Sequence, residues 1–230
     1  VDSSSGLASS LHVPGGTLVE PTDMRFLPDG RLVIVVRGGT VYVRQTTGSL
    51  TIAGTFAVDN TNSEKGLLGV EVDPSFTTTR RLFFYYSASN SNPIPGTDLD
   101  RHRVVSRTLA VNDTLSAETM LVRGLRGPAN HDGGALAIGP DGKLYIGVGD
   151  TGCNSTCCPA NNRFPTCLTN GNGKVLRVNL DGTIPTDNPL VLSGGGPATV
   201  TACGAGCTDA VSPTVTGPAR TEIWAWGFRN

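Results

Sequence analysis

Short runs of alternating apolar and polar residues occupy much of this chain, and turn residues separate them. In the clearest case, the turn Pro28-Asp29-Gly30 separates a mixed strand from a β-branched one, and Gly38-Gly39 turns the chain again. Proline presets φ for such a turn, and Asp and Gly accept the backbone conformations that follow. The pattern predicts a four-stranded antiparallel unit with strands at Thr22–Leu27, Arg31–Val36, Thr40–Arg44 and Leu50–Ala57.

The same kind of pattern returns twice further along the chain. The second unit contains the aromatic run Leu82-Phe83-Phe84-Tyr85-Tyr86, and the third is centred on the turn Gly139-Pro140-Asp141-Gly142. The expected strands are Gly66–Pro74, Arg81–Ser87, Arg103–Leu109 and Glu118–Gly124, then Ala135–Ile138, Lys143–Val148 and the strand and turn of Gly173–Gly182.

These units form an imperfect repeat. Pro28-Asp29-Gly30 and Pro140-Asp141-Gly142 are its clear copies, and Asp73-Pro74 is a weaker copy between them. Positions 28 and 74 are 46 residues apart, close to the roughly 40–50 of a propeller blade, while the 66 residues from 74 to 140 imply an insertion. The repeat favours an all-β fold, a β-propeller of four-stranded antiparallel blades, over a sandwich.

Composition narrows the class of protein. The 230 residues are expected to form a single domain, 1–230, and 30 Gly and 15 Pro with only 16% charged residues suit many tight turns. A net charge of -1 without a block of Lys or Arg argues against a nucleic-acid partner. No apolar run approaches the roughly 20 residues that span a bilayer, and residues 1–10 lack the features of a signal peptide.

Six cysteines lie in loops rich in Gly, Asn and Thr. An even number in such loops favours disulfides and an oxidising compartment, secreted or periplasmic. Cys203 and Cys207 are expected to bridge locally, and the other four to pair among themselves. A zinc site is the less favoured alternative, because these four do not form two C-x-x-C pairs. The four are Cys153, Cys157, Cys158 and Cys167.

The strongest candidate for chemistry lies at the ends of one predicted hairpin. His131 precedes its first strand and Asp150 follows its second, so both fall at the same end. A histidine held by a carboxylate is a plausible general base, although a surface histidine on a loop is an open alternative. His12 and His102 are interpreted as surface residues, and Trp224 and Trp226 as core and blade-interface packing.

Four segments together resemble the soluble quinoprotein glucose/sorbosone dehydrogenase family, six-bladed propellers that use pyrroloquinoline quinone (PQQ). Each is a weak signal alone, but their order and spacing make a specific pattern. They are Gly66-Leu67-Leu68-Gly69 with Asp73-Pro74, His131-Asp132-Gly133-Gly134 through Gly149-Asp150, Gly173-Lys174-Val175-Leu176-Arg177 through Asp187-Asn188-Pro189, and Glu222-Ile223-Trp224 through Gly227-Phe228-Arg229-Asn230.

The resemblance implies a PQQ-dependent oxidation of a sugar (aldose) hydroxyl, with an external electron acceptor. His131 matches the general base and Asp150 the carboxylate that orients it. Arg229 matches a cofactor-binding arginine and Asn230 a neighbouring polar contact. Glu64 matches a polar residue near the substrate. Asn130 stands where sugar-oxidising members can carry Asp, so substrate preference is expected to differ.

The resemblance covers roughly the first half or more of the family's length. The further quinone-binding residues and the calcium ligands that it implies would follow Asn230, so no metal ligand is assigned here. A six-bladed ring therefore needs blades beyond this chain, and we expect a longer protein or a second chain that completes the propeller. A non-catalytic secreted propeller that binds a carbohydrate or protein ligand is the alternative function.

Overall fold

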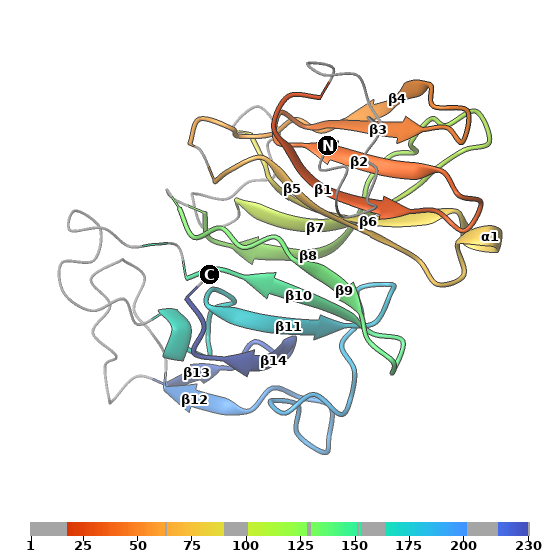
Figure 1. Cartoon of the computed structure of the whole chain (residues 1–230). Helices are drawn as coiled ribbons and strands as arrows, with labels where there is room; N and C mark the ends of the chain where they lie inside the picture. The colour runs from red at the N-terminus through yellow and green to blue at the C-terminus, as the bar shows by residue number, and fades with distance from the viewer. Residues whose placement is uncertain are drawn as a thin grey trace, which may run out of the picture.

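The structure is a computed structural model that describes residues 18–62, 64–89, 101–127, 130–150, 152, 164–201 and 216–229. These residues form three consecutive four-stranded antiparallel sheets and a small two-stranded sheet (Figure 1). The predicted all-β class is thereby confirmed. The closure of six blades into a ring stays a prediction.

Sheet 1 joins its four strands in chain order, each pair connected by a short turn. Its first turn is closed by the Gly30 N–H, which donates to the Leu27 carbonyl over 3.0 Å, and Gly30 has a φ of 84°. Glycine adopts this left-handed conformation without the Cβ clash of other residues. The strands are β1 (Pro21–Phe26), β2 (Leu32–Val36), β3 (Thr40–Arg44) and β4 (Leu50–Thr55).

Sheet 2 repeats this order, and its first turn differs from that of sheet 1. After Asp73-Pro74 the chain forms the short helix α1 (Phe76–Thr79), because the Asp73 carboxylate accepts the Ser75 N–H over 2.8 Å and pairs with Arg81. The sequence pattern did not predict this helix. The strands are β5 (Leu67–Val72), β6 (Arg81–Ser87), β7 (His102–Thr108) and β8 (Thr119–Leu125).

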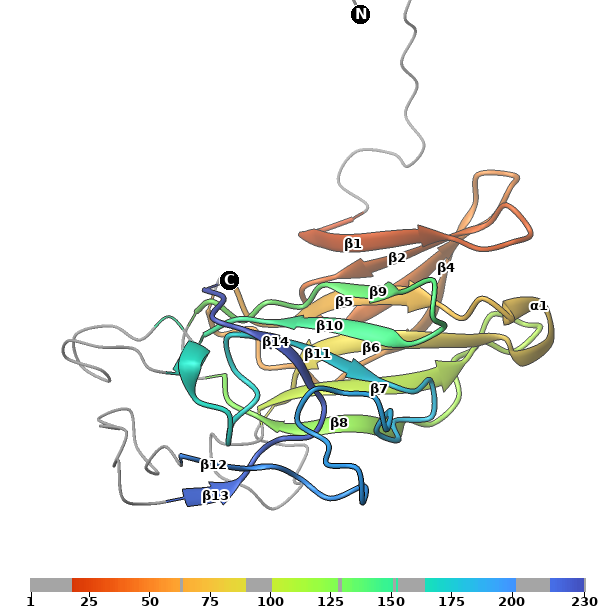
Figure 2. The same ribbon diagram turned by 90° about the horizontal axis from the view of Figure 1, so that it is seen from below.

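Sheet 3 has its fourth strand far along the chain, in the order β14-β11-β10-β9. Two elements that were not predicted precede β14: a two-stranded sheet of β12 and β13, at the lower side of Figure 2, and the 3-10 helix η2. The bounds are β9 (Leu136–Ile138), β10 (Leu144–Val148), η2 (Phe164–Thr166), β11 (Lys174–Val178), β12 (Thr199–Thr201), β13 (Thr216–Pro218) and β14 (Ile223–Trp226).

Sheet 2 lies between the other two and is buried on both faces. Phe84 and Tyr86 of β6 belong to the core shared with sheet 1, while Phe83 and Tyr85 belong to the core shared with sheet 3. A continuous apolar run is what a strand buried on both faces requires. Trp224 and Trp226 are not core residues here: they are 39% and 45% exposed.

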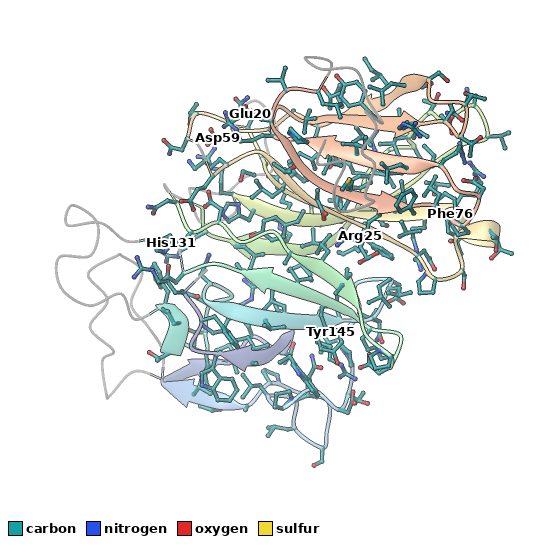
Figure 3. All side chains as sticks on the ribbon, viewed as in Figure 1. Glu20, Arg25, Asp59, Phe76, His131 and Tyr145 are labelled. Atoms are coloured by element: carbon teal, nitrogen blue, oxygen red, sulfur yellow. The ribbon has the colours of Figure 1, made fainter. Side chains whose placement is uncertain are left out.

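The first strands of the three sheets approach one another closely. Arg25 of β1 pairs with Glu71 of β5 over 3.3 Å and donates to the Leu136 carbonyl of β9 over 3.3 Å. Figure 3 shows Arg25 in the middle of the molecule and His131 at one end of the sheets. A side chain at Gly69 would lie only 2.0 Å from the Gly134 carbonyl oxygen. The approach therefore joins the sheets next to the loop that carries His131.

Candidate active site

The loop before β9 places His131 in an uncommon backbone conformation. His131 has a φ of 53°, and Gly133 and Gly134 follow with φ values of 74° and 115°. A Cβ at Gly133 would lie 2.6 Å from the Gly147 carbonyl oxygen, and one at Gly134 would lie 2.6 Å from the Leu68 side chain. The two glycines therefore let the loop pack tightly between sheets 2 and 3.

His131 and Asp150 meet at the end of the hairpin, as predicted. His131 Nδ1 lies 2.7 Å from Asp150 Oδ1, and the histidine side chain is 17% exposed. Asp150 is held in turn, because its N–H donates to the Arg229 carbonyl over 2.7 Å and its carboxylate accepts the Gly152 N–H over 3.0 Å. With Nδ1 engaged by Asp150, Nε2 is the ring nitrogen that can exchange a proton with a ligand.

Glu64 lies beside His131, although it is far away in sequence. Its carboxylate accepts a hydrogen bond from the His131 backbone N–H. The adjacent Lys65 is buried and pairs with Asp59 over 3.1 Å. Glu64 therefore holds the backbone of the candidate base, a contact that the sequence did not predict.

The other predicted site residues lie on the loops around this pair. Asn130 packs against Gly152, and its Oδ1 is buried with no hydrogen-bond partner among the described residues. Arg229 has an exposed side chain, and its carbonyl fixes Asp150. Asn230 lies outside the described residues. The structure thus brings Glu64, Asn130, Asp150 and the Arg229 backbone to the loop of His131.

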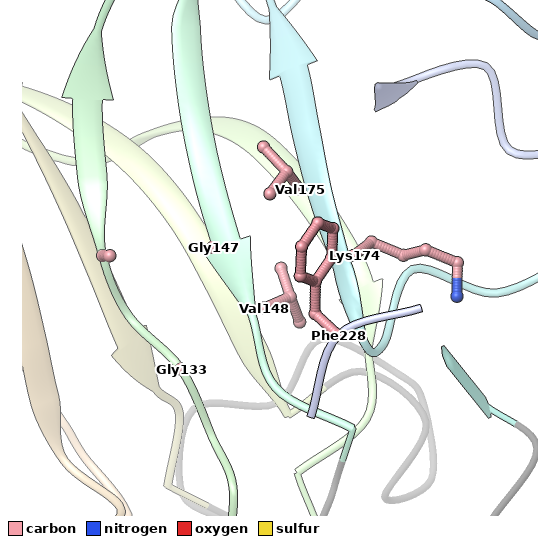
Figure 4. A pocket seen from close by; sticks show the side chains of 7 residues that line it. Gly133, Gly147, Val148, Lys174, Val175 and Phe228 are labelled. Atoms are coloured by element: carbon pink, nitrogen blue, oxygen red, sulfur yellow. The ribbon is translucent and has the colours of Figure 1, made fainter. Parts of the chain in front are cut away.

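An apolar pocket of about 340 Å³ lies on sheet 3, and its lining includes Gly133 and Phe228 (Figure 4). Gly133 belongs to the loop that carries His131, so the pocket adjoins the candidate site. Lys174 also lines it, and its Nζ donates to the carbonyls of Phe164, Pro165 and Asn172 over 2.6–3.1 Å. Burial is the main cause that lowers the pKa of Lys174 to about 7, and the positive charge of Arg220 is the smaller one.

Behind His131 lies a buried polar cluster that sequence reasoning missed. His102 is the first residue of β7 and 0% exposed, so its interpretation as a surface residue is wrong. Its Nε2 lies 2.9 Å from Asp132 Oδ1, and its Nδ1 lies 3.1 Å from Ser87 Oγ. The prediction failed because the side chain points between two sheets, which no local pattern reports. The available signal was an acid, Asp132, directly after the candidate base.

The remaining predictions concern metals, disulfides and membranes. Among the described residues, no three His, Cys, Asp or Glu side chains gather as metal ligands. Cys167 is buried and disulfide-bonded, while the other five cysteines, and with them the predicted pairing, lie outside the described residues. No helix in the described part of the chain is long and apolar enough to cross a membrane.

Fold and site together define a class: an all-β protein with a histidine–carboxylate pair at one end of a sheet, beside an apolar pocket. The sequence profile of the glucose/sorbosone dehydrogenase family matches residues 18–206. The chain belongs to this family.

Named relatives agree with this assignment. The chain is 31% identical over 191 residues to quinoprotein glucose dehydrogenase B of Acinetobacter calcoaceticus, covering 75% of this chain and 39% of the relative. It is 28% identical over 217 residues to the Escherichia coli aldose sugar dehydrogenase YliI, covering 93% of this chain and 49% of the relative. The chain thus spans half or less of the length of these relatives.

A solved structure with a similar fold contains the cofactor that the resemblance implies. The PQQ-bound aldose sugar dehydrogenase of Streptomyces coelicolor superposes with a TM-score of 0.63 and 26% sequence identity. The match covers 79% of this chain and 50% of that chain. These relatives of the chain are thus named as sugar dehydrogenases.

Proposed function

We propose that the protein containing this chain is a PQQ-dependent oxidoreductase that oxidises a hydroxyl group of an aldose sugar. The observation that carries the proposal is the His131–Asp150 pair, with Nδ1 held at 2.7 Å and Nε2 left for a ligand. PQQ and the sugar substrate come from what the relatives are named for.

In the proposed reaction, His131 Nε2 accepts the proton of the substrate hydroxyl while the carbon-bound hydrogen leaves as a hydride. When bound, PQQ supplies the two-electron acceptor for that hydride. Asp150 keeps the Nδ1 proton in place, so that Nε2 is unprotonated and can act as a base. As the ring becomes positive, the adjacent carboxylate stabilises the charge.

The residues present fit one side of a cofactor that carries three carboxylates. Arg229 has an exposed guanidinium, and a guanidinium matches a carboxylate with paired N–H donors. We assign Arg229 and Asn230 to PQQ, and Glu64 and Asn130 to the substrate side. The Glu64 carboxylate also holds the His131 backbone, so its effect on substrate is exerted at least partly through the base.

The rest of the proposal concerns the whole protein. It is a six-bladed propeller in which residues 1–230 belong to one domain, completed by further blades on the same chain or on a second chain. Calcium binds through residues that follow Asn230. The protein acts outside the cytoplasm, secreted or periplasmic, passes electrons to an external acceptor, and has disulfides among its six cysteines.

The test is dye-linked sugar oxidation by the complete protein after reconstitution with PQQ and calcium. His131→Ala should lower turnover by roughly 10²- to 10⁴-fold, because it removes the acid–base group, while PQQ is still retained. Arg229→Ala should instead weaken PQQ retention first, because it removes a charge-assisted contact to a carboxylate. The absorbance of the bound quinone measures this retention. Unchanged turnover in His131→Ala would reject the base assignment and favour the non-catalytic binding propeller.

A further inference from the structure

A fully buried polar cluster touches the backbone directly behind His131. Asp132 is 1% exposed, and its Oδ1 is 2.9 Å from His102 Nε2. Ser87 Oγ lies 3.1 Å from the other ring nitrogen, and Tyr85 donates its O–H to the Asp132 carbonyl over 2.8 Å. Sheet 2 supplies Tyr85, Ser87 and His102, and the loop before sheet 3 supplies Asp132.

The order Ser87–His102–Asp132 matches the side chains of a nucleophilic triad, but this cluster cannot act as one. A nucleophile must reach its substrate, and Ser87 and His102 are completely buried. A methyl group at Gly127 would also lie 2.4 Å from Cε1 and Nε2 of His102, so the backbone at Gly127 already closes off that part of the ring. The cluster therefore affects structure and not chemistry: it fixes Asp132 and the adjoining backbone of His131.

The position of Asp132 depends on His102. A buried carboxylate is costly unless it is paired, and His102 is the side chain that pairs with Asp132. The second oxygen, Oδ2, is buried with no hydrogen-bond partner in the described part of the chain. A neutral imidazole protonated on Nε2 satisfies both neighbours, since it donates to Asp132 and accepts from the Ser87 hydroxyl.

Asp132 follows His131 directly in the chain, so the contacts that fix Asp132 also hold the backbone of His131. Burial raises the pKa of Tyr85 well above its usual value, and the charge of Asp132 raises it further, so Tyr85 stays a neutral donor to the Asp132 carbonyl. On the other side, the His131 N–H donates to Glu64. His131, with its φ of 53°, is thus fixed from both flanks.

We propose that His102 and Asp132 are positioning residues for His131: through the buried contact between them, they hold the loop so that the His131 ring faces Asp150. The proposal rests on the proposed role of His131 as the base. Neither residue touches substrate. The contact acts on the geometry of the proton transfer, where small displacements have large effects on rate.

The experiment uses the complete protein and two readouts. The first is kcat and KM for dye-linked sugar oxidation after PQQ reconstitution; the second is the ¹⁵N and ¹H spectrum of the His131 ring in the protein without PQQ. Asp132→Asn and His102→Ala should lower kcat by roughly 10- to 100-fold with KM changed less than about threefold. In both, the hydrogen-bonded Nδ1–H signal of His131 should shift or broaden.

Asp113→Asn is the matched control. Asp113 is also buried and ion-paired, with Arg31, but it lies in the turn after β7, whereas His102 begins that strand. It should lower the melting temperature without changing kcat or the His131 spectrum. His102→Gln keeps an N–H donor and should restore part of the kcat lost in His102→Ala. Gly127→Ala crowds the ring without removing any polar group and should resemble His102→Ala.

The outcomes separate the two proposals. If His131→Ala is inactive but Asp132→Asn, His102→Ala and Gly127→Ala behave like Asp113→Asn in both readouts, the positioning proposal is wrong and the proposed function stands. If His131→Ala keeps full turnover, the proposed function fails. An unchanged His131 spectrum in Asp132→Asn, His102→Ala and Gly127→Ala would then overturn the positioning proposal as well. Should Asp132→Asn not fold, His102→Gln and Gly127→Ala decide the question.

Discussion

At the scale of the residue, hydrogen bonds to its backbone, to its ring and to the next residue hold His131 in place. Its left-handed φ of 53° costs roughly 1–2 kcal/mol for a residue other than glycine. Glu64 accepts the His131 N–H and Asp150 bonds the His131 ring, while Tyr85 donates to the carbonyl of the next residue, Asp132. These contacts offset that cost. Strain of this kind is typical of sites where the position of one side chain matters more than local stability.

Asp59, which pairs with Lys65 next to Glu64, should make the stability of the fold depend on pH. Burial alone would raise the pKa of Asp59, but hydrogen bonds from Thr61 and Lys65 lower it to about 2. The charged carboxylate therefore stabilises the fold above about pH 4, and this contribution is lost as the pH falls from 4 towards 2. We expect Asp59→Asn to lower the free energy of unfolding by about 1 kcal/mol at pH 7, after solvent screening.

Urea unfolding at pH 7 and at pH 3 to 2 measures this effect. The difference between wild type and Asp59→Asn should shrink as the pH falls. Lys65→Met serves as the control, because it removes one hydrogen-bonding partner and should weaken the pH dependence without removing the carboxylate. An equal difference at every pH would show that ionisation of Asp59 is not the source of the effect.

At the scale of the element, β6 and β7 are stabilised by burial on both faces. Alternate residues of β6 pack against sheet 1 and sheet 3, so the strand has no polar face. β7 repeats this arrangement, with Val105 in one core and Val104 in the other. The central sheet therefore contributes apolar surface to two cores at once.

Two valines of sheet 2 and its turn test this arrangement. Val105 is 0% exposed, whereas Val111, in the turn after β7, is 88% exposed. Val105→Ala should lower the free energy of unfolding by about 2 kcal/mol, because it removes buried methyl groups and leaves a cavity. Val111→Ala should change it by less than about 0.5 kcal/mol. Denaturant unfolding measures both, and equal losses would contradict the described burial.

At the scale of the whole molecule, contact between sheets places the candidate site. The loop of His131 belongs to sheet 3, yet Glu64 precedes sheet 2 and His102 begins a strand of sheet 2. The two sheets approach each other closely at the backbones of Gly69 and Gly134. Relative movement of sheets 2 and 3 would therefore disturb the site directly.

Gly69→Ala is expected to disturb this approach. The new methyl group would lie 2.0 Å from the Gly134 carbonyl oxygen, so the sheets must separate. We expect a loss of roughly 1–3 kcal/mol in unfolding free energy and a lower turnover. Gly38→Ala is the control, because a methyl group there meets no atom within 4 Å. Thermal unfolding and sugar oxidation measure these effects. Equal results for Gly69→Ala and Gly38→Ala would contradict this account.

The strands and the His131–Asp150 pair could be predicted because both depend on local order. Alternation marks the strands, and a hairpin brings its two ends together whatever packs around it. The helix α1 and the burial of His102 could not be predicted in this way. The first depends on how the Asp73 carboxylate bonds the chain after it, and the second on which face of β7 meets sheet 3.

The sequence by itself determined the all-β class, the resemblance to a family and the identity of the candidate base, since these follow from residue order over a few dozen positions. Only the tertiary structure decided that the Glu64 carboxylate binds the His131 backbone and that His102 supports Asp132. These contacts join residues 67 and 30 positions apart and link the loop before sheet 3 to the loop before sheet 2 and to the start of β7. Such contacts exist only when apolar faces pack and bring distant strands together, so no local pattern contains them.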